Sequence, residues 1–136
     1  MPHAASFIAG QFAAALDAED YAAAFALLAE DCLYEINGAL RSTRHAIVES
    51  YRASAEDARR RFDEVEYLSA VAAAGDDSAV ITFIDRLRLG DHWHEHRCRQ
   101  HLAVNQRGLI AAISHEELPG EREHLAAFEA RPVRPR

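Results

Sequence analysis

The chain has 136 residues, of which 49% are hydrophobic and 27% are charged, and this is the size and composition of one globular domain. These values exclude two independent domains, a disordered chain and a membrane-embedded chain. The formal net charge of −7 at pH 7 repels nucleic acid and anionic lipid, so we expect neither as a partner.

The N-terminal part is predicted to form two helices and then a strand. Apolar residues recur at helical spacing over 4–18, and an alanine-rich run that follows Asp20 predicts a second helix through Leu28. Residues Cys32–Ile36 favour a strand, which stops at Asn37-Gly38, a pair suited to positive φ in a turn. Two helices and one strand therefore open the chain.

A third helix is predicted over Arg44–Arg61, with Thr43 as its N-terminal cap. Its Arg59-Arg60-Arg61 run is expected at the solvated end. The sequence then changes to strand-like segments that are separated by turn residues. The predicted strands span 64–74, 78–89, 92–104 and 109–118. Short turns between consecutive strands indicate antiparallel hairpins.

The end of the chain is predicted to be a short helix over 121–129, followed by a disordered tail over 131–136 that has no means of burying itself. A single domain over 1–130 remains. Helices that precede an antiparallel sheet are typical of an α+β fold. We therefore expect three N-terminal helices on the concave face of a strongly curved antiparallel sheet, in the order α-α-β-α-β-β-β-β.

The hairpin at Gly90-Asp91 fixes which side chains share one face of the sheet. Glycine at the first central position suits a two-residue type II′ turn, which places Asp85 directly opposite His96. Apolar Ile81 and Phe83 have the same parity as Asp85, so this face is predicted to point inward. Asp85 is therefore expected to be an inward-facing carboxylate.

The next hairpin adds further ionisable groups to the same face. A turn centred on Gln106-Arg107 sets Cys98 against His115, His96 against Glu117 and Gln100 against Ile113, and a slip of two residues would leave all of them inward. The predicted inward set is Ile81, Phe83, Asp85, Leu87, His94, His96, Cys98, Gln100, Ile113, His115 and Glu117. Because unpaired buried charges are costly, this set predicts a cavity that water or a ligand can reach.

Four short segments give the chain a family resemblance over residues 5–118. They are Leu16-Asp17-Ala18-Glu19-Asp20-Tyr21, Leu28-Ala29-Glu30-Asp31, Ala46-Ile47-Val48-Glu49-Ser50-Tyr51 and Arg107-Gly108-Leu109-Ile110. In their order and spacing the chain resembles the nuclear transport factor two-like superfamily, which includes SnoaL-like polyketide cyclases and ketosteroid isomerases. The resemblance implies a cone of curved sheet around three helices, a ligand in its mouth and a homodimer through the outer sheet face.

The catalytic residues of the isomerases are not carried over to this chain. By the resemblance, their phenol donor falls at Phe12, their general-base aspartate at Ile36 and their second oxyanion-hole acid at Gln100. Steroid isomerisation by that machinery is therefore disfavoured. Tyr51 matches a tyrosine of the family's pocket, and Tyr34 shares a strand face with Ile36, so two phenols are expected at the cavity.

The inward face predicts acid–base chemistry on a small organic ligand, without a cofactor. Asp85 or Glu117 is expected to orient His96, with His115 nearby, and an imidazole so held can move a proton near neutral pH. Such a group would serve an isomerase, dehydratase, cyclase or hydrolase; the alternative is a noncatalytic ligand-binding or dimeric interaction module. The predicted ligand-contacting residues are Phe12, Tyr34, Ile36, Tyr51, Phe83, Cys98, Gln100 and Ile113.

Two other interpretations of the same residues are weaker. His94 and His96 alternate along one strand and could share a metal with His115 or Glu117, but this spacing is common by chance, and no metal is predicted. Cys98 beside His115 lacks the oxyanion site that a nucleophilic thiol needs.

Cysteine usage and hydropathy bear on where the protein works. Cys32 and Cys98 are far apart and outside any CxxC spacing, and no window approaches the roughly 18 apolar residues of a membrane span. The sequence also has no signal-peptide pattern at its N-terminus. We therefore expect a cytoplasmic protein.

Overall fold

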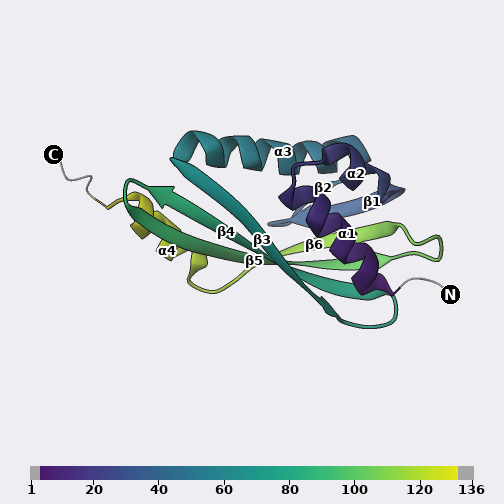
Figure 1. Ribbon diagram of the computed structural model, residues 1–136. Coiled ribbons are helices and arrows are strands. Elements are labelled where there is room, and N and C mark those ends of the chain that lie inside the picture. The colour runs from purple at the N-terminus through teal and green to yellow at the C-terminus, as the bar shows by residue number, and fades with distance from the viewer. Residues whose placement is uncertain (1–3, 132–136) are drawn as a thin grey trace.

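The computed structural model describes residues 4–131, in which four helices accompany one six-stranded sheet (Figure 1). In chain order the elements are α1 (Ala5–Asp17), α2 (Tyr21–Ala26), β1 (Leu28–Ile36), β2 (Ala39–Arg41), α3 (Arg44–Arg61), β3 (Glu64–Ala73), β4 (Ser78–Leu89), β5 (His92–Val104), β6 (Ile110–Glu117) and α4 (Glu121–Glu129). Of the tail predicted over 131–136, residues 132–136 lie outside the described part of the chain.

The sheet is mixed, whereas an antiparallel sheet was expected. Its strand order is β2-β1-β6-β5-β4-β3, and β1 runs parallel to β6 while every other neighbouring pair is antiparallel. The hairpins from β3 to β6 are antiparallel, as predicted. The parallel pair arises because β1 lies beside β6, the last strand, rather than beside β3, the next long strand. Helix α3 and the hairpins connect β1 to β6 along the chain.

The expected strong curvature of the sheet is wrong, because the sheet twists without curling strongly (Figure 1). Curling is introduced by β-bulges. Strand β4 pairs residue by residue with β5 along its whole length and with β3 from Ala79 to Arg88, without a register shift. Within residues 4–131, irregular pairing occurs only where β1 meets β6 and between Ala103 and Val104 of β5.

The second helix is shorter than predicted, and the first strand is longer. Helix α2 ends at Ala26 and β1 begins at Leu28, where a strand was expected only from Cys32. Leu28 is fully buried and pairs with Ile110 of β6, so burial and strand pairing override the helical propensity of the alanine-rich run. The three-residue strand β2 was not predicted; it follows the expected turn, where Asn37 has a φ of 51°.

The third helix begins as predicted. The Thr43 hydroxyl accepts a hydrogen bond from the backbone N–H of Ala46 at 3.0 Å, which satisfies one of the unpaired donors at the helix N-terminus. The helix ends at Arg61, where the backbone becomes extended at Phe62, and the Phe62 side chain is buried.

The first predicted register is confirmed, and the second differs by two residues. Asp85 lies opposite His96, but Glu117 lies opposite Cys98 rather than His96, and His115 lies opposite Gln100. The loop is longer than a two-residue turn because the Asn105 side-chain oxygen accepts hydrogen bonds from two backbone N–H groups within it, at 2.9 and 3.1 Å. An even shift leaves every side chain on its predicted face.

The core lies between the sheet and the helices. Helix α1 packs against β3, β4 and β5, and α3 against β1 and β3. The largest fully buried side chains are Phe12, Leu28, Ile47, Ile81, Leu102, Ile110, Ile113 and Cys32. A second, small apolar cluster consists of Phe62, Leu87 and Phe128, the last of which belongs to α4. No helix within residues 4–131 is long and apolar enough to span a membrane.

Candidate functional site

A cavity of about 320 Å³ lies between the helices and the inward face of the sheet. Ten of the twelve predicted site residues line it: Asp85, His96, His115, Glu117, Tyr34, Ile36, Tyr51, Phe83, Cys98 and Gln100. The other two do not. Phe12 and Ile113 are buried in the core, where the ring of Phe12 meets the edge of Tyr51 at a centroid distance of 5.7 Å.

The deep end of the cavity is organised by Gln100, which is only 3% exposed. The Tyr51 hydroxyl donates to Gln100 Oε1 at 2.5 Å. The Gln100 Nε2 group donates to the Tyr34 hydroxyl at 3.0 Å and to Nδ1 of His115 at 3.2 Å. One amide from β5 thereby holds side chains from β1, α3 and β6 in a fixed arrangement.

These hydrogen bonds determine what the deep end offers to a ligand. Because His115 accepts at Nδ1, its proton resides on Nε2, and the ring is a neutral N–H donor. Burial lowers the pKa of His115, which favours that neutral form. Burial also raises the pKa of Tyr34 and Tyr51, so both phenols keep their protons. The deep end is therefore neutral and suited to an oxygen-bearing ligand group.

The second polar region surrounds Asp85 of β4. This residue lies between Tyr67 of β3 and His96 of β5 in the pairing of the sheet, and Asp17 approaches it from the end of α1. The Ser69 hydroxyl donates to Asp17 at 2.6 Å. Burial, followed by the negative charge of Asp17, raises the pKa of Asp85 to about 6. Near neutral pH, Asp85 can therefore both accept and donate a proton.

The expected pairing among the four acid–base residues is not found. No hydrogen bond or ion pair joins Asp85 to His96 within the described residues, and Nδ1 of His96 is buried without a protein partner. Glu117 instead forms an ion pair with Arg122 of α4. The shifted register explains this difference, because it moves Glu117 away from His96. The four side chains therefore share one cavity without forming a bonded pair.

Two further interpretations of the sequence lose their geometric basis. His94 does not line the cavity; its ring stacks on Phe128 of α4 at 5.1 Å, so His94 and His96 are not brought together as ligands. Burial, followed by the charge of Asp85, raises the pKa of the Cys98 thiol to about 12. A thiol that stays protonated is a poor nucleophile.

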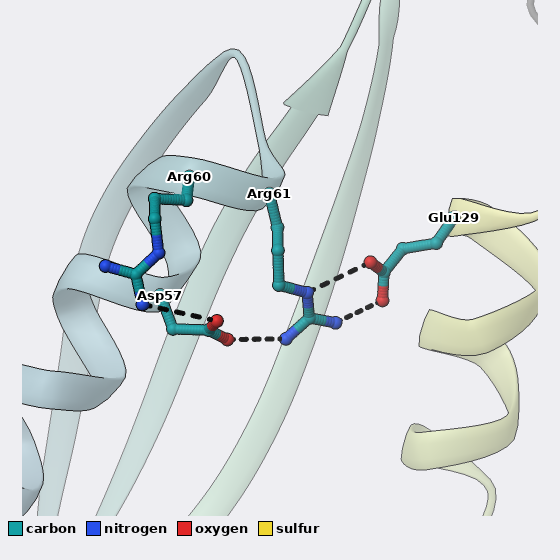
Figure 2. A network of polar contacts seen from close by, with 4 residues as sticks. All are labelled: Asp57, Arg60, Arg61 and Glu129. Atoms are coloured by element: carbon teal, nitrogen blue, oxygen red, sulfur yellow. Dashed lines mark hydrogen bonds and ion pairs between the residues drawn. The ribbon is translucent and has the colours of Figure 1, made fainter.

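Helices α3 and α4 border one end of the cavity. Figure 2 shows Arg61 between two carboxylates: its guanidinium bonds to Asp57 at 3.0 Å and to both carboxylate oxygens of Glu129. Arg60 reaches Asp57 at 3.7 Å. Asp57, Arg61 and Leu125 all line the cavity. Of the arginine run expected at a solvated helix end, Arg61 thus also borders the cavity.

Several lining residues were not anticipated from the sequence, including Asp17, Tyr67 and Arg61. Tyr67 has the same strand parity as Val65 and Val71, so alternation along β3 could have identified it. Asp17 carried no comparable signal, because its position depends on where α1 ends above the sheet.

Comparison with solved structures shows the same fold in proteins of low sequence identity. A candidate polyketide cyclase from Xanthomonas campestris pv. campestris superposes with a TM-score of 0.70 at 14% identity, covering 93% of this chain and 96% of that one. A Mycobacterium tuberculosis protein in complex with estradiol-17β-hemisuccinate has a TM-score of 0.63 at 15% identity, covering 88% and 98%.

A computationally designed binder of 17-OHP has the same TM-score of 0.63 at 15% identity. The superposition covers 88% of this chain and 95% of the binder. Neither a family model nor a curated protein matches the sequence. The chain therefore shares the fold of these proteins, as its resemblance to the nuclear transport factor two-like superfamily implies.

Proposed function

We propose that the cavity binds a small cyclic organic molecule with an oxygen function, and that Asp85 exchanges a proton with it. One observation carries the proposal: the partly buried carboxyl of Asp85, with a pKa of about 6, shares a cavity with a set of neutral hydrogen-bonding groups. Perturbed acids in concave sites are candidates for general acid–base groups.

The dimensions of the cavity favour a ligand of two or more rings. His96 and Gln100 lie four residues apart on β5, a separation of about 13 Å along an extended strand. Phe83 and Cys98 form the less polar stretch between the two polar ends. The steroid derivative bound by one structural neighbour, and the designed binder of 17-OHP, support a cyclic ligand for this chain as well.

The chemistry follows from the two ends. A carbonyl or hydroxyl oxygen at the deep end would accept from Nε2–H of His115, which Gln100 holds in place. At the other end Asp85, assisted by His96, would take or deliver a proton. This arrangement fits an isomerase, dehydratase, cyclase or hydrolase.

The noncatalytic alternative has its own supporting observation. Asp85 and His96 are not hydrogen-bonded to each other, and Glu117 is held by Arg122. A cavity with these groups could bind a ligand without transforming it, and the test below separates the two functions.

The test uses 2-tetralone, a two-ring ketone whose protons next to the carbonyl exchange with solvent. In deuterated buffer we expect the protein to accelerate this exchange, and Asp85→Asn to reduce the catalysed rate by at least about 100-fold. The exposed Asp76→Asn is the matched control and should exchange like the wild type. Exchange is followed by proton NMR, with backbone amide shifts in the same samples reporting binding.

The outcomes are distinct. Exchange that disappears with Asp85→Asn while 2-tetralone still shifts cavity amides supports acid–base catalysis. Binding without any accelerated exchange supports the noncatalytic module. If 2-tetralone shifts no cavity amide at millimolar concentration, the proposed ligand class is wrong.

Two predictions about the protein's context belong to the same proposal. The resemblance supports a homodimer through the outer face of the sheet. The two cysteines, both free thiols, support a reducing cytoplasmic location.

A further inference from the structure

The cavity combines aromatic walls with an excess of carboxyl groups. The chain has four tyrosines, and all of them line the cavity; they are Tyr21, Tyr34, Tyr51 and Tyr67. Phe62 and Phe83 add two further rings. The lining also contains four carboxyl groups and one arginine; they are Asp17, Asp57, Asp85, Glu117 and Arg61.

Two of these carboxyl groups are already neutralised. Asp57 bonds to Arg61, and Glu117 bonds to Arg122. Arg61 also bonds to Glu129 of α4, so this cation already has two carboxylate partners. Charges at this end of the cavity are therefore balanced by the protein itself.

The other two carboxyl groups, Asp17 and Asp85, have no ion pair within the described residues. The one side-chain hydrogen bond shown for Asp17 comes from Ser69, and none is shown for Asp85. Beside them the hydroxyl oxygen of Tyr67 is buried without a partner. Carboxylates removed from water are stable only when a cation or several hydrogen-bond donors compensate them.

A ligand could supply the missing compensation. An ammonium group would donate hydrogen bonds to the two carboxylates and to the Tyr67 oxygen, and aromatic faces attract cations. We propose that the ligand of this cavity carries a protonated amine on its ring system, held between Asp17, Asp85 and Tyr67. This inference rests on the proposed binding function and specifies its ligand class.

The amine and the proposed chemistry are compatible. A cation beside Asp85 favours the carboxylate form, which is the form that accepts a proton. Binding of the amine would thus favour the carboxylate form of Asp85, which is the form that acts as a general base. The opposite end of the ring system remains available for the hydrogen bond from His115.

The test compares three molecules with one skeleton: 2-aminotetralin, which is cationic at pH 7, the neutral 2-tetralol, and the anionic tetralin-2-carboxylate. Isothermal calorimetry at pH 7 is expected to rank the amine at least tenfold tighter than the alcohol, with the carboxylate weakest. Asp17→Asn and Asp85→Asn should each remove at least tenfold of the amine's affinity and leave the alcohol's affinity within twofold. Asp76→Asn, an equal loss of charge at an exposed site, should change neither affinity.

The results separate this inference from the proposed function. Equal or tighter binding of the alcohol than of the amine, or amine binding that survives both substitutions, overturns the inference while the cavity remains a binding site for neutral rings. Failure of all three molecules to bind at millimolar concentration overturns both. Thermal unfolding of each variant confirms that the comparison uses folded protein.

Discussion

At the scale of single residues, Asp85 places a cost on the folded state that depends on pH. Its pKa is about 6 in the fold against an ordinary value of 3.8. The folded protein therefore holds this proton more tightly than the unfolded chain does. As the pH rises from about 4 to 6, loss of this proton lowers the free energy of unfolding of the protein. We predict that Asp85→Asn raises the free energy of unfolding by about 1–3 kcal/mol at pH 7 and changes it little at pH 4.

Denaturant unfolding of the two proteins at both pH values measures this difference. Asp76→Asn serves as control, because its exposed carboxyl has no such burial cost. An Asp85→Asn variant that is less stable than the wild type at pH 7 would contradict the assigned role of burial. A stabilising loss of the proposed catalytic acid would be the expected trade between stability and activity.

The alternation of residues along the strands predicted most of the side chains that line the cavity. It could not predict which of these side chains bond to one another. Alternation along β4, β5 and β6 correctly placed Asp85, His96 and His115 on one face. Which of these groups bond to one another depends on register and on neighbours from other elements. Glu117 shows this, since it bonds to Arg122 of α4, a residue that strand alternation does not address.

At the scale of elements, α4 packs on the second apolar cluster through Phe128 and lines one end of the cavity through Leu125. Phe128 is 6% exposed and lies between Phe62, at 6.5 Å, and His94, at 5.1 Å. The ion pair of Glu129 with Arg61 is partly exposed, and such pairs contribute at most about 1 kcal/mol. Apolar packing, rather than the ion pair, is therefore expected to hold α4 in place.

We predict that Phe128→Ala costs about 2–3 kcal/mol locally and raises amide hydrogen exchange in α4 by one to two orders of magnitude, with little change in β4. Glu129→Gln, which removes only the ion pair, should raise the exchange in α4 by no more than about fivefold, which corresponds to about 1 kcal/mol. Site-resolved exchange by NMR measures both. If Glu129→Gln opens α4 as much as Phe128→Ala does, the ion pair is the dominant contact.

Element boundaries were predictable where the local sequence and the tertiary contacts agree. Thr43 caps α3, and Gly90-Asp91 gives the β4–β5 register, because each signal acts through its own backbone. The start of β1 and its parallel pairing with β6 were not predictable. They depend on burial of Leu28 against Ile110, a partner that comes much later in the chain.

At the scale of the whole molecule, the outer face of the sheet divides into two parts. Toward the β4–β5 turn it carries ion pairs, among them Arg86 with Glu66 and with Glu95. Toward the other end it is more apolar: Leu33 is 47% exposed and Leu40 is 64% exposed, beside a groove whose lining combines Ala103 and Ala112 with Glu35, His101 and Ser114. The homodimer proposed for this face would use that apolar part.

Introducing a charge into the groove tests this dimer. Ala103 and Ala112 are paired across β5 and β6, and both are exposed, so Ala103→Glu changes the outer face without entering the core. A stable dimer buries roughly 800 Å² per partner, and a buried unpaired carboxylate at its centre weakens association by at least tenfold. Sedimentation should therefore show a wild-type dimer and an Ala103→Glu monomer, whereas Ala127→Glu, the same change on exposed α4, should remain dimeric. A monomeric wild type would contradict the proposed dimer, and an Ala103→Glu variant that still dimerises would exclude the apolar groove as its contact, because a buried unpaired carboxylate at the centre of that contact would weaken association.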